Sequence, residues 1–325
     1  AVHGWSWSCP ATRPRRPEPT AADLDSRPMT GEEATFLPVS IILGGVQKGA
    51  SGTLHALLVR HRHVARHGVK ERHFFDDDSR DWSTPDYSDY GTVPRADQQG
   101  LARRAIDSTP SYPFWPGAVE RIAAYDAHLA ATGGPQVQVV LCFRDPIERA
   151  FSQWTMLTDK LAGKREYPSF GELIRMRTPG VSEVPEGWSK RDARQYSVVA
   201  RGLYGVQLRR ALEHLPRERM LLMRFDDVVG DPAAALDTMT DFLGLHRFGR
   251  DIDPRPRNSH ERRLDAPPPT GEDLRLLADT YADDLATFTA VSGLDTSGWS
   301  TARILRDDLD PAELADRLAR KAGLL

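Results

Sequence analysis

The sequence is poor in cysteine and has no long apolar run. Only Cys9 and Cys142 occur among its 325 residues, so neither a disulfide framework nor a cysteine-ligated metal site is expected. No stretch approaches the ~20 apolar residues of a membrane-spanning helix, and nothing resembles the apolar core of a signal peptide. These absences predict a cytoplasmic protein with reduced thiols and no membrane span.

An excess of either charge is also lacking. The 43 Lys and Arg residues nearly balance the 46 Asp and Glu residues, and the net charge of −3 gives no electrostatic reason to expect nucleic acid as a partner. Three histidines (His61, His63 and His67) are closely spaced but lack an acidic or cysteine complement, so no metal site is predicted. Heavy use of Arg, Ala and Asp indicates a high-GC bacterial source.

The order of apolar segments predicts an α/β protein. Residues 1–37 show no sustained periodicity and are expected to form a flexible tail, with one domain over residues 38–325. Strands are expected near 39–43, 105–107, 137–143 and 220–225. Helices are expected at 53–63, 118–132, 146–159, 196–215, 231–243, 271–292 and 311–321, and the long polar stretch 160–195 is expected to be a lid. Strands that alternate with helices predict a P-loop-like three-layer fold with a central parallel sheet flanked by helices.

A glycine-rich loop follows the first predicted strand. The strand ends at Gly44-Gly45, and small residues around Lys48 lead into a helix. This order is how α/β proteins bind phosphate through backbone N–H groups and a helix N-terminus. In the Walker A pattern the lysine directly precedes the hydroxyl residue that binds Mg²⁺, whereas Lys48 stands three residues before Ser51. The loop therefore predicts a phosphate site of another kind.

Five blocks in order resemble the sulfotransferases that use 3′-phosphoadenosine-5′-phosphosulfate (PAPS). The loop 47–51 is similar to their K-G-G-T loop, and 70–76 (K-E-R-H-F-F-D) resembles a segment of the heparan sulfate branch. Residues 143–152 are similar to the family's L-R-D-P-x-E-R-x-x-S block. Residues 201–204 resemble its (R/S)-x-x-Y helix start, and 225–245 its next strand and helix. The resemblance implies a transferase that moves a sulfuryl group from PAPS to a hydroxyl, releases PAP, and uses no metal.

The resemblance also implies roles for individual residues. Lys48 would stabilise the leaving phosphate, Glu71 would be the general base, and His73 would orient the base or the acceptor. The 5′-phosphosulfate would be bound by a run of small residues: Gly49, Ala50, Ser51, Gly52 and Thr53. The rest of the nucleotide, with its 3′-phosphate, would be bound by Arg144, Ser152, Tyr204, Asn258 and Arg262.

The acceptor is expected to be a small molecule or a glycoside. Ser108 occupies the position of a lysine in the E-K-T-P segment of glycan-modifying members, which points away from a heparan-like acceptor and towards bacterial natural product biosynthesis. Trp82, Tyr87 and Tyr90 form either a stacking platform for a sugar or an aromatic scaffold. A P-loop metabolite kinase and a catalytically inactive nucleotide-binding module remain as alternatives.

Overall fold

The computed structural model describes residues 36–66, 68–98, 100–164, 166–176, 194–248 and 264–325. A compact unit extends from Thr35 to Leu325. Its first strand begins at Leu37, one residue before the expected start of the domain. The expected flexible tail lies outside the described residues except for its last two. Within the described part of the chain, no helix combines the length and apolar character needed to cross a bilayer.

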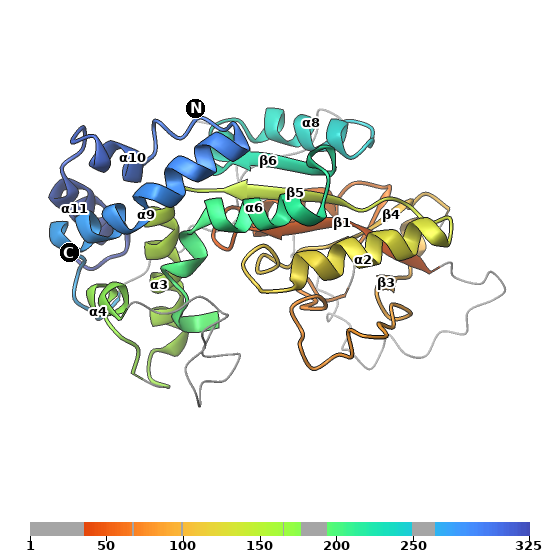
Figure 1. Ribbon diagram of the computed structural model, residues 1–325, viewed down its shortest axis with the longest axis horizontal. Helices are drawn as coiled ribbons and strands as arrows, with labels where there is room; N and C mark the ends of the chain where they lie inside the picture. Colours follow the sequence, from red (N-terminus) through yellow and green to blue (C-terminus); the bar gives the residue numbers. More distant parts are fainter. Residues whose placement is uncertain (1–35, 67, 99, 165, 177–193, 249–263) are drawn as a thin grey trace, which may run out of the picture. The chain divides into compact units, whose positions relative to one another are not determined.

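A mostly parallel sheet forms the middle of the domain (Figure 1). Its strands are β1 (Leu37–Gly45), β2 (Val64–Arg66), β3 (Gly91–Thr92), β4 (Arg104–Asp107), β5 (Gln138–Phe143) and β6 (Met220–Arg224). The order β2-β4-β1-β5-β6 is parallel throughout, and only β3 is antiparallel, paired with β1. The predicted central parallel sheet is therefore confirmed.

Helices follow most of the strands. They are α1 (Ser51–Leu58), α2 (Ala118–Ala131), α3 (Pro146–Leu161), α4 (Phe170–Arg175), α6 (Tyr204–His214), α7 (Phe225–Gly230), α8 (Pro232–Phe242), α9 (Gly271–Ser292), α10 (Ser300–Leu305) and α11 (Pro311–Lys321). α3 begins as expected, because Asp145 caps it by accepting the Glu148 N–H at 2.8 Å and Pro146 occupies the first turn.

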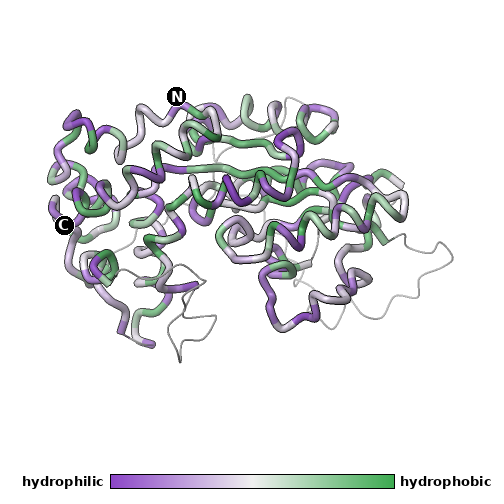
Figure 2. Tube along the Cα trace, viewed as in Figure 1, coloured by the Kyte–Doolittle hydropathy of each residue, from purple (hydrophilic) through white to green (hydrophobic). Residues whose placement is uncertain are grey.

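Helices cover both faces of the sheet, as the alternation along β5 shows. Val139, Leu141 and Phe143 join the cluster that includes α2, α6 and the C-terminal half of α9. Val140 and Cys142 point the other way, into the cluster with α1 and α8. Figure 2 shows the central strands as mainly hydrophobic segments between these helices. The three-layer architecture is therefore confirmed, and a third cluster joins α3, α4, α11 and the N-terminal half of α9.

The helix predicted at 53–63 is too long. α1 ends at Leu58, because the N–H groups of Arg60 and His61 turn back onto the carbonyls of Leu57 and Leu58. Val64 then begins β2, which pairs with the start of β4. The apolar residues of this region were predicted to form one helix, but they belong to two elements, the short helix α1 and the strand β2.

Two further segments differ from expectation. The predicted lid contains the helix α4. Its capping box between Ser169 and Glu172 is a sequence signal for a helix start that was missed within the long polar stretch. The helix predicted at 196–215 is interrupted, because residues 197–199 form a turn and residues 200–202 form the 3₁₀ turn η4 (Ala200–Gly202) before α6 begins. Residues 177–193 of the expected lid lie outside the described residues.

The loop after β1 uses left-handed backbone at non-glycine residues. Lys48 has φ of 70° and Ala50 has φ of 68°. A Cβ makes this conformation cost roughly 1–2 kcal/mol per residue. The loop therefore holds its shape against a local penalty.

Replacing Ala50 with glycine is expected to raise the free energy of unfolding by about 1 kcal/mol, because glycine adopts positive φ without a Cβ clash. Urea denaturation measures this change. Ala56→Gly is the matched control, since this exposed residue lies inside α1. There the same change is expected to lower stability by about 1 kcal/mol. A loss of stability at both positions would contradict the strained geometry at Ala50.

Candidate active site

Loops that follow three neighbouring strands meet at one edge of the sheet. β1 leads into loop 46–50, β4 into loop 108–117 and β5 into the start of α3, and parallel strands end at the same edge. The first two loops lie against each other, since a Cβ built on Gly45 would lie 3.2 Å from Cγ of Pro113 and 3.5 Å from the Pro110 carbonyl oxygen. The predicted site residues that the structure describes are carried mainly by these loops.

Gly49 brings the loop after β1 against the end of β5. The Val46 N–H donates to the Cys142 carbonyl at 2.9 Å, and the Gly49 N–H closes a turn onto the Val46 carbonyl at 2.9 Å. A Cβ at position 49 would lie 2.2 Å from the same Cys142 oxygen, so only glycine fits. Gly49 therefore contributes space, while its N–H is used inside the loop.

The N-terminus of α1 adds backbone donors. Its first intrahelical hydrogen bond runs from Leu54 N–H to the Ala50 carbonyl at 3.0 Å, so the N–H groups of residues 50–53 precede the helical pattern. Ala50 is the N-cap and makes no side-chain capping bond. Ser51 is buried, Thr53 is half-buried and Gly52 is exposed. A helix start of this kind, with the half-buried Lys48 before it, suits a phosphate group.

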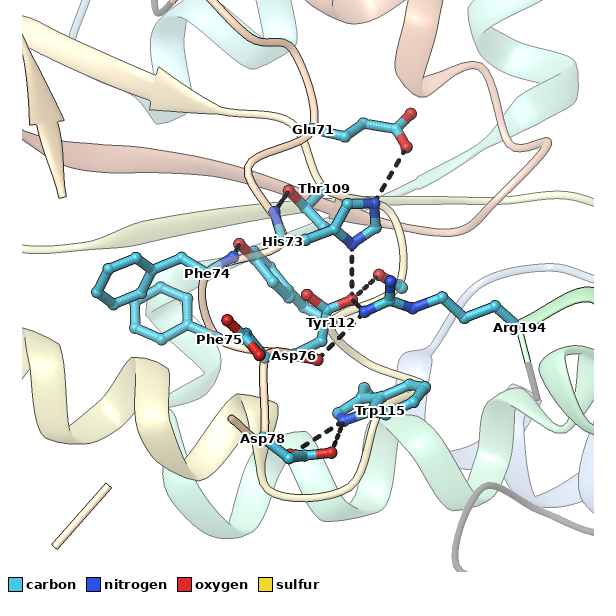
Figure 3. A network of polar contacts seen from close by, with 12 residues as sticks. Glu71, His73, Phe74, Phe75, Asp76, Asp78, Thr109, Tyr112, Trp115 and Arg194 are labelled. Carbon is cyan, nitrogen blue, oxygen red and sulfur yellow. Dashed lines mark hydrogen bonds and ion pairs between the residues drawn. The ribbon is translucent and has the colours of Figure 1, made fainter. Parts of the chain in front are cut away.

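Glu71, His73 and Asp76 form a chain of polar contacts at the same edge (Figure 3). Nε2 of His73 lies 3.7 Å from Oε2 of Glu71, and Nδ1 of His73 lies 2.8 Å from Oδ2 of Asp76. Asp76 is fully buried, whereas the Glu71 side chain is 40% exposed and so can meet a substrate. An ionised Asp76 accepts the proton of Nδ1, which leaves Nε2 facing Glu71. Glu71 also accepts a hydrogen bond from Lys70 at 2.9 Å.

Three donors support the charge on Asp76. Burial opposes ionisation, but hydrogen bonds from His73 and Ser111 and the charge of Arg194 hold the pKa of Asp76 below its ordinary value. Ser111 donates to Oδ2 at 2.6 Å, and Arg194 does so at 3.1 Å. Arg194 comes from a segment 118 residues further along the chain, so this ion pair joins two distant parts of the fold.

A second buried carboxylate, Asp107, fixes the backbone that carries this chain. It is fully buried and accepts hydrogen bonds from the hydroxyls of Thr109 at 2.7 Å and Tyr112 at 2.6 Å. The same two hydroxyl oxygens accept the backbone N–H groups of His73 at 3.3 Å and Phe74 at 3.2 Å. The Thr109 and Tyr112 hydroxyls thus connect Asp107 to the backbone just after Glu71 and hold that segment in place.

Arg144 lies at the end of β5, where a phosphate site was predicted. Its guanidinium lies 3.1 Å from Glu148 and 4.6 Å from the centroid of the Phe225 ring. Its buried Nε has no acceptor within the described residues. Ser152 is half-buried and stands one turn beyond Glu148 on the same face of α3. Tyr204 is buried and donates to the Arg144 carbonyl at 2.9 Å, so it supports the backbone of Arg144.

On the acceptor side, Ser108 is fully buried. Its hydroxyl lies 2.7 Å from Nδ1 of His55, a half-exposed residue of α1. The polar side chain that reaches the surface at this position is therefore His55. Ser108 also donates its backbone N–H to the Lys70 carbonyl at 3.3 Å, which ties the segment of Glu71 to the end of β4.

The aromatic residues of the acidic loop pack mainly inward. The Tyr87 ring contacts those of Tyr125 and His128 on α2 at centroid distances of 4.9 and 5.0 Å. Trp82 donates to the Asp77 carbonyl at 2.9 Å and forms one wall of a small cavity of about 160 Å³. The Arg121 guanidinium lies 4.6 Å from the centroid of the Trp82 ring. Trp82 and Tyr87 thus pack against the domain core, and Trp82 also faces the cavity.

Some residues that shape this site were not predicted, and two predicted residues cannot be placed. Asn258 and Arg262 lie outside the described residues. Asp76 ends the H-F-F-D motif, whose spacing from His73 is a sequence signal for their contact. No local signal marks Arg194 as a support of the site, because its partner Asp76 lies in a distant loop. Asp107 bonds two residues of the loop that follows it, but its contact with Tyr90 joins it to another loop.

Comparisons with known proteins find similar chains by sequence and by fold. The family model of the sulfotransferase domain matches residues 40–253. Human heparan sulfate glucosamine 3-O-sulfotransferase 3B1 is 30% identical over 220 residues, which are 67% of this chain and 49% of the human protein. Mouse heparan sulfate glucosamine 3-O-sulfotransferase 6 is 28% identical over 250 residues, 74% of this chain and 64% of the mouse protein. The chain thus spans about half the length of the human relative.

A solved structure supports the fold. The sulfotransferase from Alicyclobacillus acidocaldarius superimposes with a TM-score of 0.57 over 80% of this chain and 98% of its own, at 22% identity. The family model covers well over half of the chain and includes the phosphate loop, the Glu71–His73–Asp76 chain and Arg144. On these grounds the chain belongs to the sulfotransferase domain family.

Proposed function

We propose that this protein transfers a sulfuryl group from PAPS to a hydroxyl group of a small-molecule or sugar-containing acceptor. The observation that carries the proposal is the Glu71–His73–Asp76 chain at the same sheet edge as the phosphate loop. Family membership favours this activity over that of a metabolite kinase. An inactive nucleotide-binding module would bind the nucleotide but transfer no sulfate to any acceptor.

The acceptor hydroxyl would meet Glu71. Glu71 removes its proton as the oxygen attacks sulfur, and His73, oriented by the buried Asp76, supports the carboxylate from the other side. General-base catalysis of this kind contributes ~10²–10⁴-fold in rate.

The donor nucleotide fits the residues present. The N–H groups of residues 50–53, at the start of α1, suit the 5′-phosphosulfate. Lys48 would neutralise charge on the leaving phosphate. The unpaired Nε of Arg144 and the hydroxyl of Ser152 suit the 3′-phosphate. Asn258 and Arg262 would complete the nucleotide site.

The acceptor proposal departs from the relatives. Those relatives are heparan sulfate glucosamine sulfotransferases, and a glucosamine acceptor is therefore one member of the proposed class. In this chain Ser108 bonds His55, and Lys70 is paired with Glu71. The loop over residues 76–89 carries six aspartates. These features favour an acceptor with little negative charge over a polyanionic glycan.

Replacing Glu71 with glutamine is expected to lower transfer ~10²–10⁴-fold, because the amide cannot accept the proton. Labelled sulfate transferred from PAPS into a bacterial cell extract measures the rate, and mass spectrometry then identifies the product. Glu120→Gln, on the exposed surface of α2, is the control and should transfer normally. Normal transfer by both variants would exclude Glu71 as the base.

Lys48→Ala is expected to reduce the rate of transfer by about 10²–10³-fold, because the variant lacks the positive charge that would stabilise the negative charge developing on the leaving phosphate. The thermal unfolding midpoint should change little, since Lys48 is only half-buried. Lys160→Ala at the exposed end of α3 is the matched control. If Lys48→Ala lost its fold along with its activity, the activity loss would not support a catalytic role.

Arg144→Met is expected to remove selectivity for the 3′-phosphate. The wild-type protein should bind PAP more tightly than 5′-AMP, and the variant should lose about 10- to 100-fold in PAP affinity only, as expected for hydrogen bonds to a charged group. Calorimetry measures both nucleotides, and Arg209→Met on the exposed face of α6 is the control. Stronger thermal stabilisation of the wild type by ATP–Mg²⁺ than by PAP would instead indicate a kinase.

A further inference from the structure

Arg201 is a buried cation with no counter-charge in contact. The residue is 4% exposed and lies in η4, immediately before α6. Its Nε donates to the Ser197 hydroxyl at 3.0 Å, and its guanidinium lies 4.5 Å from the centroid of the Phe114 ring. Over the described ranges of the chain, its two Nη atoms have no acceptor and no carboxylate forms an ion pair with it.

The surroundings increase the local positive charge. Burial, followed by the charges of Arg149 and Arg194, lowers the pKa of Arg201 to about 9, while Asp76 and Glu71 act in the opposite direction. Arg149 is itself fully buried, and its described hydrogen bonds include those to the neutral Gln153 side chain and a backbone carbonyl. The buried Asp76 is already engaged by Arg194. Arg201 is therefore left without a negative partner.

This cation lies beside the proposed reaction centre. Arg194 and Arg201 lie over adjacent rings, Trp115 and Phe114, at 5.0 and 4.5 Å from their centroids. Both rings belong to the loop after β4, which also bonds the backbone of His73. Arg201 thus faces the same loop that positions the proposed base.

A buried charge without a partner destabilises a fold, so buried charges are normally paired or bind a ligand. We propose that the two Nη atoms of Arg201 bind an oxyanion, which is either the sulfuryl group of the donor or an anionic group of the acceptor. This inference rests on the proposed sulfuryl transfer. A planar guanidinium binds two oxygens of such a group through parallel hydrogen bonds. Arg201 would then supply positive charge on the side of the sheet where Ser108 replaces a lysine.

The first test separates ligand binding from structural support. Arg201→Met keeps a long apolar side chain against Phe114 but removes the unpaired charge. Its thermal unfolding midpoint should equal or exceed that of the wild type. Arg210→Met is the matched control, because Arg210 donates to the backbone carbonyls of Pro113 and Phe114 in the same loop. That variant should unfold at a lower temperature and bind every probe normally.

Calorimetry on the full chain then compares three probes, which are PAPS, PAP, and inorganic sulfate added to the PAP complex. If the ligand is the sulfuryl group, Arg201→Met weakens PAPS binding by about 10- to 100-fold and leaves PAP unchanged. If the ligand belongs to the acceptor, PAPS and PAP bind normally, and the binding of sulfate to the PAP complex is lost. Each of these two results supports an oxyanion site at Arg201 and identifies its source.

Other outcomes overturn the inference. Equal binding of all three probes by the wild type and Arg201→Met excludes an oxyanion site. A lower unfolding midpoint for Arg201→Met, with a parallel loss of PAP affinity, shows that the residue is structural. Failure of the wild-type protein to bind PAP is a separate result, because it refutes the proposed donor and not only the role of Arg201.

Discussion

The site depends on one buried carboxylate, Asp107, at the end of β4. Burial raises the pKa of Asp107, and three hydroxyl donors, from Tyr90, Thr109 and Tyr112, counteract that effect. These donors belong to two different loops, so the carboxylate joins both to the sheet. Since two of the same hydroxyls also accept backbone N–H groups next to Glu71, the position of the proposed base is set from the interior of the protein. The exposed side chain of Glu71 thus extends from a backbone segment that these hydrogen bonds hold in place.

Two arginines, the half-buried Arg104 and the buried Arg201, have different partners near the two edges of the sheet. Arg104 lies where the strands begin, and burial lowers its pKa to about 10, yet it donates to Ser40 and to the carbonyls of Ser40 and Leu243. Those bonds connect β4, β1 and the end of α8. Arg201, near the edge where the strands end, lacks comparable acceptors for its Nη atoms among the described residues. The bonds of Arg104 connect elements of the fold, whereas the Nη atoms of Arg201 are the donors for which an oxyanion is proposed.

The sequence predicted the features that depend on neighbouring residues. The apolar run of β5, the Asp145-Pro146 start of α3 and the small residues around Lys48 are local patterns, and the structure contains all three. Contacts between distant segments could not be predicted. Arg194 reaches Asp76 across 118 residues, and neither residue carries a pattern that identifies the other. The period of the apolar residues also failed after Leu58, because hydrogen bonds of the following turn ended the helix there.

The contact between Gly49 and the Cys142 carbonyl places unequal constraints on its two partners. A backbone oxygen is present whatever amino acid stands at position 142, so that position can vary among related proteins as far as packing between α1 and α8 allows. Position 49 has no such freedom, since any side chain would collide with that oxygen. The distance between the ends of β1 and β5 therefore requires glycine at position 49 of the phosphate loop. Substitutions in the core beneath this loop are therefore tolerated more readily than a substitution of Gly49.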